Sequence, residues 1–212
     1  SKVATPPESP EAGGDYSLNV DPPTYRQPHP VVRLDDLCRE TKFSRQEIRH
    51  MYRGFKQQCP EGIVHEETFK EIFAKFFPYG SSNLYAHYVF RTFDMNRNGA
   101  IGFKDLLTSL STLLRGNSFE KLRWAFQLYD IDGDGLITKQ EMLNIVSSVY
   151  DMMGKSLSPS AEEKLARDHV DRIFEILDRN QDGVVTIEEF IEACLRDEVI
   201  SQSLKMFDES EL

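Results

Sequence analysis

Long hydrophobic runs are the most evident absence in this chain of 212 residues. No apolar stretch approaches the roughly eighteen residues that a membrane-spanning helix requires, so we expect neither a membrane span nor a signal peptide. Cysteine is scarce as well, and Cys38, Cys59 and Cys194 form no CxxC pair. This pattern disfavours a disulfide framework or a cysteine metal cluster and favours a reducing cytosol. The chain begins at Ser1, and the sequence leaves open whether a lipid signal precedes it.

Positive charge is also in short supply. The 25 Lys and Arg residues are outnumbered by 35 Asp and Glu residues, and the formal net charge is -10. Neutralising the phosphates of a nucleic acid requires clustered basic residues, so the charge argues against a nucleic-acid partner. The five His residues form no pattern of metal ligands or of a base beside a nucleophile, and we therefore expect no enzyme activity.

Residues 1–32 differ in composition from the rest of the chain. Seven of the ten prolines lie in the first thirty residues, where apolar residues are sparse and show no period. Such a segment buries too little apolar surface to fold alone, so we predict a disordered or extended arm. The repeats described below divide the remainder into segments 33–116 and 117–197, followed by a C-terminal segment, 198–212.

Two twelve-residue segments carry the strongest functional signal. They run from Asp130 to Glu141 (loop 3) and from Asp178 to Glu189 (loop 4), with oxygen-bearing side chains at positions 1, 3 and 5, glycine at position 6 and glutamate at position 12. This is the rule for a calcium-binding EF-hand loop, in which position 7 adds a backbone carbonyl and the glutamate can contribute both carboxylate oxygens. The predicted ligands of the two calcium ions are Asp130, Asp132, Asp134, Leu136 and Glu141, and Asp178, Asn180, Asp182, Val184 and Glu189.

A third segment, Asp94 to Asp105 (loop 2), follows the same pattern less completely. Its ligands would be Asp94, Asn96, Asn98, the backbone of Ala100, and Asp105. Aspartate is one methylene shorter than glutamate, so bidentate closure at position 12 is hard to reach, and six-coordinate magnesium suits the loop better than calcium. The sequence leaves two outcomes open, a loop that holds magnesium or weakly bound calcium and a loop that holds no ion.

A fourth segment, 57–68 (loop 1), aligns with the others on Gly62 but has lost the ligand pattern. Cys59 stands at position 3 and Thr68 at position 12, while Pro60 fixes the backbone inside the loop. We predict that loop 1 keeps the scaffold of the repeat and binds no ion.

The apolar residues repeat together with the loops. Position 8 is β-branched in every loop, where it favours pairing with a neighbouring loop in a short strand; these residues are Val64, Ile101, Ile137 and Val185. The flanking segments carry apolar residues at helical spacing. Because two such units bury each other's apolar faces, the sequence predicts an all-α fold of four EF-hands in two pairs, with short β pairings between loops.

Several short motifs make the chain similar to the neuronal calcium sensor family. They include an ineffective first loop with Cys59-Pro60-Glu61-Gly62, the preceding Arg53-Gly54-Phe55, and the stretches 76–80 and 120–126. Within that family, residues 52–56, 85–88, 113–116 and 150–155 most resemble the Kv-channel-interacting proteins. The resemblance covers about residues 33–212.

This resemblance implies a calcium-binding auxiliary subunit of voltage-gated A-type potassium channels. Such a subunit is cytoplasmic, lies at the plasma membrane through the channel or a lipid, and assembles with the channel by holding its N-terminal helix in an apolar groove. The groove positions of the family fall here on Met51, Phe55, Phe69, Ile72, Phe73, Phe76, Leu106 and Leu110. The residues agree in part, because the four from Phe69 to Phe76 lie on one face of a helix.

Other functions remain open at this stage. A calcium-dependent regulator of a kinase, cyclase or exchange factor would use the same kind of groove. A second alternative is a passive calcium buffer, whose EF-hands barely open. A third is a transcriptional repressor that calcium releases from DNA, and the acidic net charge counts against it. In a sensor, calcium draws Glu141 and Glu189 onto the ion and swings their helices outward, which exposes apolar surface to an amphipathic helix.

The C-terminal segment 198–212 carries Ile200, Leu204 and Phe207 at i, i+4 and i+7. This spacing predicts an amphipathic helix. Two interpretations stay open for that helix. It competes with a partner for the groove, or it packs permanently beside the second pair.

Overall fold

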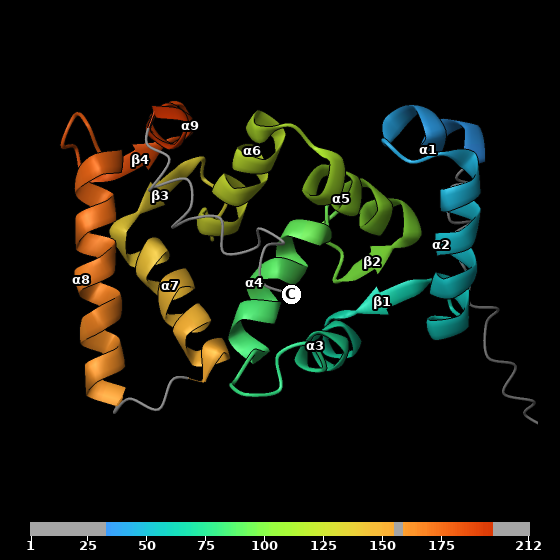
Figure 1. Ribbon diagram of the computed structural model, residues 1–212, viewed down its shortest axis with the longest axis horizontal. Coiled ribbons are helices and arrows are strands. Elements are labelled where there is room, and N and C mark those ends of the chain that lie inside the picture. The colour runs from blue at the N-terminus through green and yellow to red at the C-terminus, as the bar shows by residue number, and fades with distance from the viewer. Residues whose placement is uncertain (1–32, 155–158, 197–212) are drawn as a thin grey trace, which may run out of the picture. The chain divides into compact units, whose positions relative to one another are not determined.

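Helices dominate the computed structural model, which describes residues 33–154 and 159–196 (Figure 1). The predicted arm, residues 1–32, and the predicted C-terminal helix, residues 198–212, lie outside the described residues. The elements of the first half are α1 (Leu34–Glu40), α2 (Arg45–Gln58), β1 (Ile63–His65), α3 (Glu66–Ala74), α4 (Asn83–Phe93), β2 (Ala100–Gly102) and α5 (Phe103–Arg115). Those of the second half are α6 (Ser118–Tyr129), β3 (Leu136–Thr138), α7 (Lys139–Met153), α8 (Pro159–Leu177), β4 (Val184–Thr186) and α9 (Ile187–Arg196).

Side-chain caps explain where several of these helices begin. Ser44 and Glu47 form a reciprocal capping box at the start of α2, and Asn117 and Glu120 form one at the start of α6. At the start of α7 the same device is made by positions 9 and 12 of loop 3, Thr138 and Glu141. The residues that begin this helix are therefore also the residues that close a predicted ion site.

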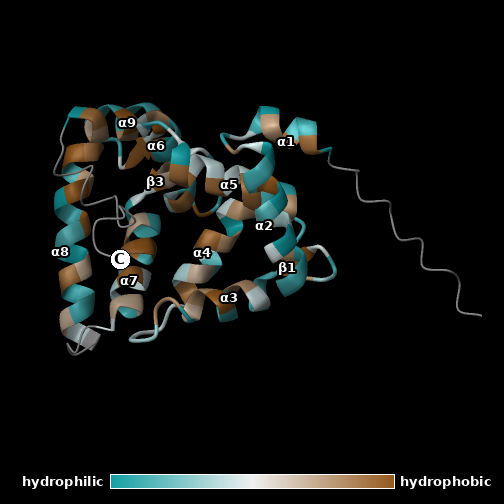
Figure 2. Ribbon diagram, turned by 45° about the vertical axis from the view of Figure 1, so that its right-hand side comes forward, coloured by the Kyte–Doolittle hydropathy of each residue, from teal (hydrophilic) through white to brown (hydrophobic). Residues whose placement is uncertain are grey.

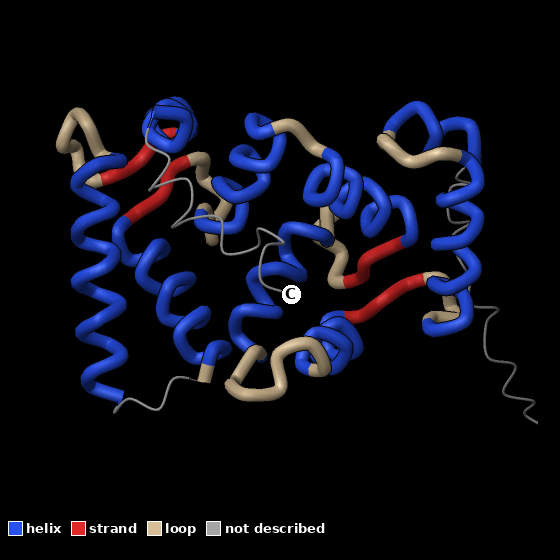
Figure 3. The backbone as a smooth tube through the Cα atoms, in the orientation of Figure 1, coloured by secondary structure: helices blue, strands red, loops and turns tan. Residues whose placement is uncertain are grey.

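The short strands pair as the β-branched position 8 predicted. In one antiparallel pair, β1 and β2, Val64 lies opposite Ile101, and in the other, β3 and β4, Ile137 lies opposite Val185 (Figure 3). All four residues are buried. The predicted all-α fold with two inter-loop β pairings is confirmed, and loop 1 keeps its strand although its ligand pattern is lost.

A continuous core joins the two halves. Phe93 of α4 meets Trp124 of α6 edge to face, with ring centroids 6.5 Å apart, and both residues are buried. The same core contains Phe90 and, from the second half, Phe190. A smaller cluster of Leu37, Phe43, Ile48 and Leu107 holds α1 and α2 against α5. Because of this shared core, every described residue belongs to one compact unit.

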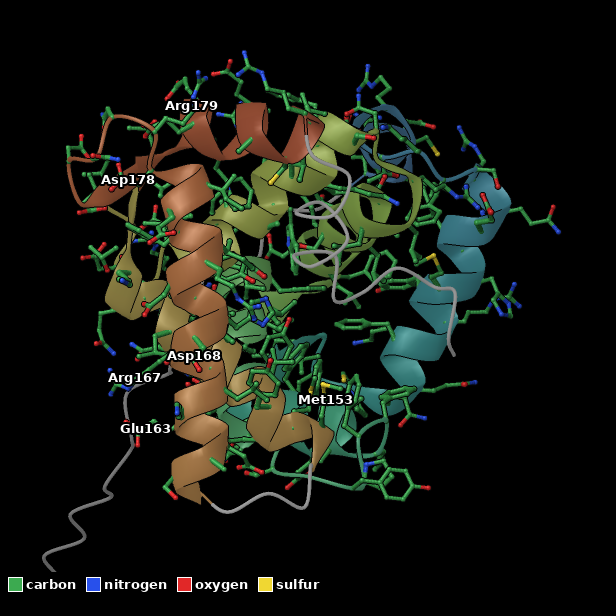
Figure 4. All side chains as sticks on the ribbon, turned by 60° about the vertical axis from the view of Figure 1, so that its left-hand side comes forward. Met153, Glu163, Arg167, Asp168, Asp178 and Arg179 are labelled. Carbon is green, nitrogen blue, oxygen red and sulfur yellow. The ribbon has the colours of Figure 1, made fainter. Side chains whose placement is uncertain are left out.

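The longest described helix, α8, is amphipathic. Its charged residues include Arg167 and Glu163, which form an ion pair at 2.7 Å one turn apart (Figure 4). Across residues 33–154 and 159–196, no helix is both long enough and apolar enough to cross a membrane.

Candidate metal centre

Loop 3 brings three aspartate side chains to one point. Asp130, Asp132 and Asp134 each offer a carboxylate oxygen, and these oxygens lie within 4.8 Å of one another. Backbone N–H groups hold two of the carboxylates in place. Asp130 Oδ2 accepts from the Gly135 N–H at 3.0 Å, and Asp134 Oδ1 accepts from the Leu136 N–H at 2.8 Å. This donor set suits a hard divalent cation that prefers oxygen ligands.

Glu141 reaches across the same loop from the start of α7. Its Oε1 accepts from the Ile131 N–H at 2.9 Å, and its Oε2 accepts from the Thr138 hydroxyl at 2.7 Å. Position 12 is therefore held next to positions 2 and 9, with both oxygens inside the loop. When calcium is bound, Glu141 would supply the closing carboxylate, and Leu136 would supply its backbone carbonyl.

Loop 4 repeats this arrangement. Asp178 is only 8% exposed and accepts from the Gly183 N–H at 3.0 Å. Asp182 accepts from the Val184 N–H at 3.1 Å, and Glu189 accepts from the Thr186 hydroxyl at 2.8 Å. Asn180 lies beside Asp182, with its amide nitrogen 2.9 Å from the carboxylate. Loop 4 therefore fits the same kind of cation, with one negative charge fewer at position 3.

Loop 2 resembles loops 3 and 4 at position 1 but differs from them at position 12. Asp94 is buried and accepts from the Gly99 N–H at 2.7 Å, as the first residue of loops 3 and 4 does. Asp105, at position 12, accepts from the Gly102 N–H at 3.3 Å and from the Asn96 amide at 3.4 Å. Across the loop, Glu141 reaches the backbone N–H of position 2, whereas the shorter Asp105 reaches only the side chain of position 3. The missing methylene is therefore visible as a shorter reach.

Loop 1 is closed by a cation of the protein itself. The Lys56 ammonium donates to the Pro60 carbonyl, and its Nζ lies 3.6 Å from the position that a Cβ on Gly62 would occupy. Cys59, at position 3, is buried, and burial raises the pKa of its thiol. A fixed ammonium beside a loop with few carboxylates disfavours a divalent cation there.

The carboxyl groups of the loops respond differently to burial. Burial is the main cause that raises the pKa of Asp130, and the nearby charges of Asp134 and Glu141 add to it. Burial also raises the pKa of Asp105. For Glu141, burial acts in the same direction, but hydrogen bonds from Thr138, Asp132 and Ile131 outweigh it and lower the pKa. The backbone N–H of Thr186 lowers the pKa of Glu189. The closing glutamates are thus held in the charged form that binds a cation.

One contact between loops was not visible in the sequence. Arg97, at position 4 of loop 2, lays its guanidinium on the backbone of Gly133 at position 4 of loop 3, so that a Cβ there would collide with it. Both residues have positive φ, 52° for Arg97 and 76° for Gly133. Together they line a cleft of about 570 Å³ between loops 2 and 3. Only the tertiary structure reveals this contact, because 36 positions separate the two residues.

Seven of the eight predicted groove residues lie on three helices of the first half, and the eighth, Phe76, lies just after one of them. Phe55 of α2 is buried and contacts the ring of Phe103, with centroids 5.4 Å apart. Phe76, just after α3, is 71% exposed. The other six are partly buried, on α2, α3 and α5: Met51, Phe69, Ile72, Phe73, Leu106 and Leu110.

Comparison with known protein families gives two matches. Residues 35–111 and residues 119–195 each match an EF-hand domain pair. The helices, paired strands and oxygen-lined loops define a calcium-binding helix-loop-helix protein. Since the two matches together cover most of the chain, it belongs to the EF-hand calcium-binding proteins, a class whose members are typically regulatory sensors without catalytic activity.

Proposed function

We propose that this protein is a calcium sensor that acts as an auxiliary subunit of a voltage-gated A-type potassium channel. It holds the N-terminal helix of the channel on an apolar face of its first EF-hand pair. In this proposal it is cytoplasmic, lies at the plasma membrane through the channel, and has no enzyme activity. Loops 3 and 4 each bind calcium, loop 1 binds no ion, and loop 2 either binds magnesium or weak calcium or stays empty.

The observation that carries the proposal is the poor burial of α3. This helix contains Phe69, Ile72 and Phe73, yet none of its residues is fully buried. The stripe continues into Phe76, which is 71% exposed. We refer to these four residues as the α3 face. An apolar surface of this kind, left uncovered by the described residues, is typical of a site where another molecule docks.

The rings beside this stripe form a connected aromatic surface. Phe69 and Phe73 stack with centroids 5.9 Å apart, and Phe73 stacks on Phe77 at 4.9 Å. Phe69 also meets Phe90 of α4 edge to face at 5.6 Å. Figure 2 shows hydrophobic stretches along α3 and α4. The α3 face is therefore backed by rigid core residues, so an amphipathic helix would meet a preformed surface.

The test is the binding of a labelled peptide with the sequence of a channel N-terminal helix. We expect Phe76→Ala to weaken binding at least tenfold, because the most exposed ring of the α3 face is lost. The matched control is Ile176→Ala on α8, which removes an apolar side chain that is 48% exposed but far along the chain from the α3 face. Equal affinity of both variants for the peptide, or no binding by the unmodified protein, would reject the proposal.

A further inference from the structure

The turn between α3 and α4 rests directly on the C-terminal end of α7 (Figure 1). The Ser81 N–H donates to the Asp151 carbonyl at 3.0 Å. The same carbonyl also accepts from the N–H of Gly154, the C-cap of α7, at 3.3 Å, so two donors share it. The first EF-hand pair therefore adds a backbone hydrogen bond to the end of a helix of the second pair.

Two glycines make this contact possible. A Cβ on Gly80 would lie 2.6 Å from the carbonyl carbon of Met152 and would also collide with the Asp151 and Met152 carbonyl oxygens. A Cβ on Gly154 would lie 2.7 Å from the carbonyl carbon of Tyr79. Both clashes involve backbone atoms, which cannot move aside as the end of a side chain can. We call this backbone contact of residues 79–81 with residues 151–154 the α7 joint.

The two ends of α7 thus connect two functional regions. Its first turn holds Glu141, the closing ligand of loop 3, and its last residues meet the α7 joint. The helix has 15 residues, which corresponds to a length of about 22 Å. It also packs along α4. Phe77 lies just before the joint in the chain, and its ring stacks on that of Phe73. The joint is thereby connected to the α3 face.

Within residues 33–154 and 159–196, loop 4 has no equivalent connection. Its closing ligand, Glu189, lies in the first turn of α9, and the main contacts of α9 are with α6, α8 and β4. A movement of Glu189 therefore acts mainly within the second pair. A movement of Glu141 is carried by α7 to the first pair.

We propose that α7 is the lever by which calcium in loop 3 regulates the α3 face, and that the α7 joint transmits its movement. This inference rests on the proposed binding of a helix to that face. When calcium repositions Glu141, the whole of α7 shifts as a rigid rod, and residues 79–81 move with its far end. The position of α3, and hence its affinity for a helix, changes with the occupancy of loop 3.

The experiment measures the Kd of the labelled channel peptide in saturating calcium and in chelator, using the full chain. The unmodified protein should show a calcium-dependent change in Kd of at least about tenfold, within the usual range for coupled sites. Gly80→Ala separates the backbones at the joint and should reduce the change to within about twofold. The control is Gly54→Ala on α2, where a Cβ would meet nothing within 4 Å, and it should keep the change of the unmodified protein.

A second comparison does not depend on Gly80→Ala folding normally. Between saturating calcium and chelator, the peptide Kd of Glu141→Gln should not change. The peptide Kd of Glu189→Gln should still change, by at least half of the unmodified protein's change in log Kd. Equal effects of these two variants, or a full calcium-dependent change in folded Gly80→Ala, would overturn the lever and leave the proposed function intact. If the unmodified protein binds the peptide with the same Kd in both conditions, the lever is also rejected. Absence of peptide binding in both conditions would instead reject the proposed function itself.

Discussion

The helices that follow loops 1 and 3 occupy equivalent places in the repeat and are used in opposite ways. The helix after loop 3, α7, buries six residues, among them Met142 and Ile145, which are at most 1% exposed. The helix after loop 1, α3, buries none. Both follow a loop whose position 8 is paired in a strand. The comparison shows that the EF-hand scaffold does not fix the role of the helix that follows its loop. One such helix, α7, contributes buried residues to the core, whereas the other, α3, has none.

The same two loops differ in how their charge is balanced. Loop 3 gathers three aspartates and a glutamate, whereas in loop 1 the ammonium of the preceding residue, Lys56, donates to the Pro60 carbonyl. Loop 1 therefore keeps its shape without an ion, and the first pair keeps an apolar face that does not depend on calcium in that loop. The second pair carries the two loops that we predict to bind calcium.

The largest expected effect concerns the contrast between buried and exposed phenylalanines. Phe190 of α9 is fully buried and contacts Phe126 at 5.7 Å. We expect Phe190→Ala to lower the free energy of unfolding by about 3–5 kcal/mol, because it leaves a cavity. Phe76→Ala, at a largely exposed position, should change that free energy by no more than about 0.5 kcal/mol. Chemical denaturation in chelator measures both, and similar losses for the two variants would contradict the assignment of surface and core.

The second prediction tests the assignment of calcium to the second pair. Two sites with dissociation constants of about 10⁻⁷ to 10⁻⁵ M are expected by calorimetry. The double variant Glu141→Gln, Glu189→Gln removes the closing carboxylate from both loops and should leave neither site measurable in that range. Glu61→Gln in loop 1 is the control and should leave two sites. Tight binding that survives the double substitution would contradict the predicted ligands.

A smaller effect is expected from lengthening the closing residue of loop 2. Asp105→Glu adds the methylene that separates this loop from loop 3, so position 12 can reach the ion instead of the Asn96 amide. The calcium affinity of loop 2 should rise by about tenfold, which corresponds to about 1.4 kcal/mol. Calorimetry should then detect an additional calcium site. A calcium count and affinity equal to those of the unmodified protein would show that reach is not what limits loop 2.

The smallest effect concerns how α2 is attached within the first pair. Hydrogen bonds from Arg115 and Ser44, together with the charge of Arg115, lower the pKa of Glu47 from its ordinary value of 4.5 to about 2. Because the pKa is lower in the folded state, the contribution of this carboxylate to stability is complete above about pH 4.5 and is lost as the pH falls towards 2. Both side chains are exposed, so solvent and salt reduce the effect.

Arg115→Met is the variant that isolates this contribution. The difference in unfolding midpoint between the unmodified protein and Arg115→Met should shrink as the pH is lowered from 5 to 2, and it should be smaller in high salt. Chemical denaturation at a series of pH values measures this difference. A difference that stays constant over the range would show that Arg115 acts through the Phe43 ring or the Lys42 carbonyl, which it also contacts, and not through Glu47.

The ligand pattern and the strand pairing could be predicted from the sequence because both are local. Twelve consecutive residues determine where a loop places its oxygens, and the left-handed φ of 89° at Gly135 is the kind of conformation that glycine adopts readily. Position 8 pairs with its counterpart in the next loop because the repeat brings equivalent residues together. The repeated positions of ligand and apolar residues were therefore sufficient to predict four loops in two pairs.

What the tertiary structure alone decided are the contacts between residues far apart in the chain. Phe55 and Phe76 had equal standing in the sequence as groove residues, yet Phe103 of α5 helps to cover Phe55 while Phe76 stays exposed. Gly80 had no evident partner in the sequence, and its role follows only from the end of α7 lying against it. The sequence by itself determined which residues can bind a cation, because ligand geometry is set within a single loop. Only the packed structure placed residues 79–81 against the end of α7, because that contact joins backbone segments that lie far apart in the chain.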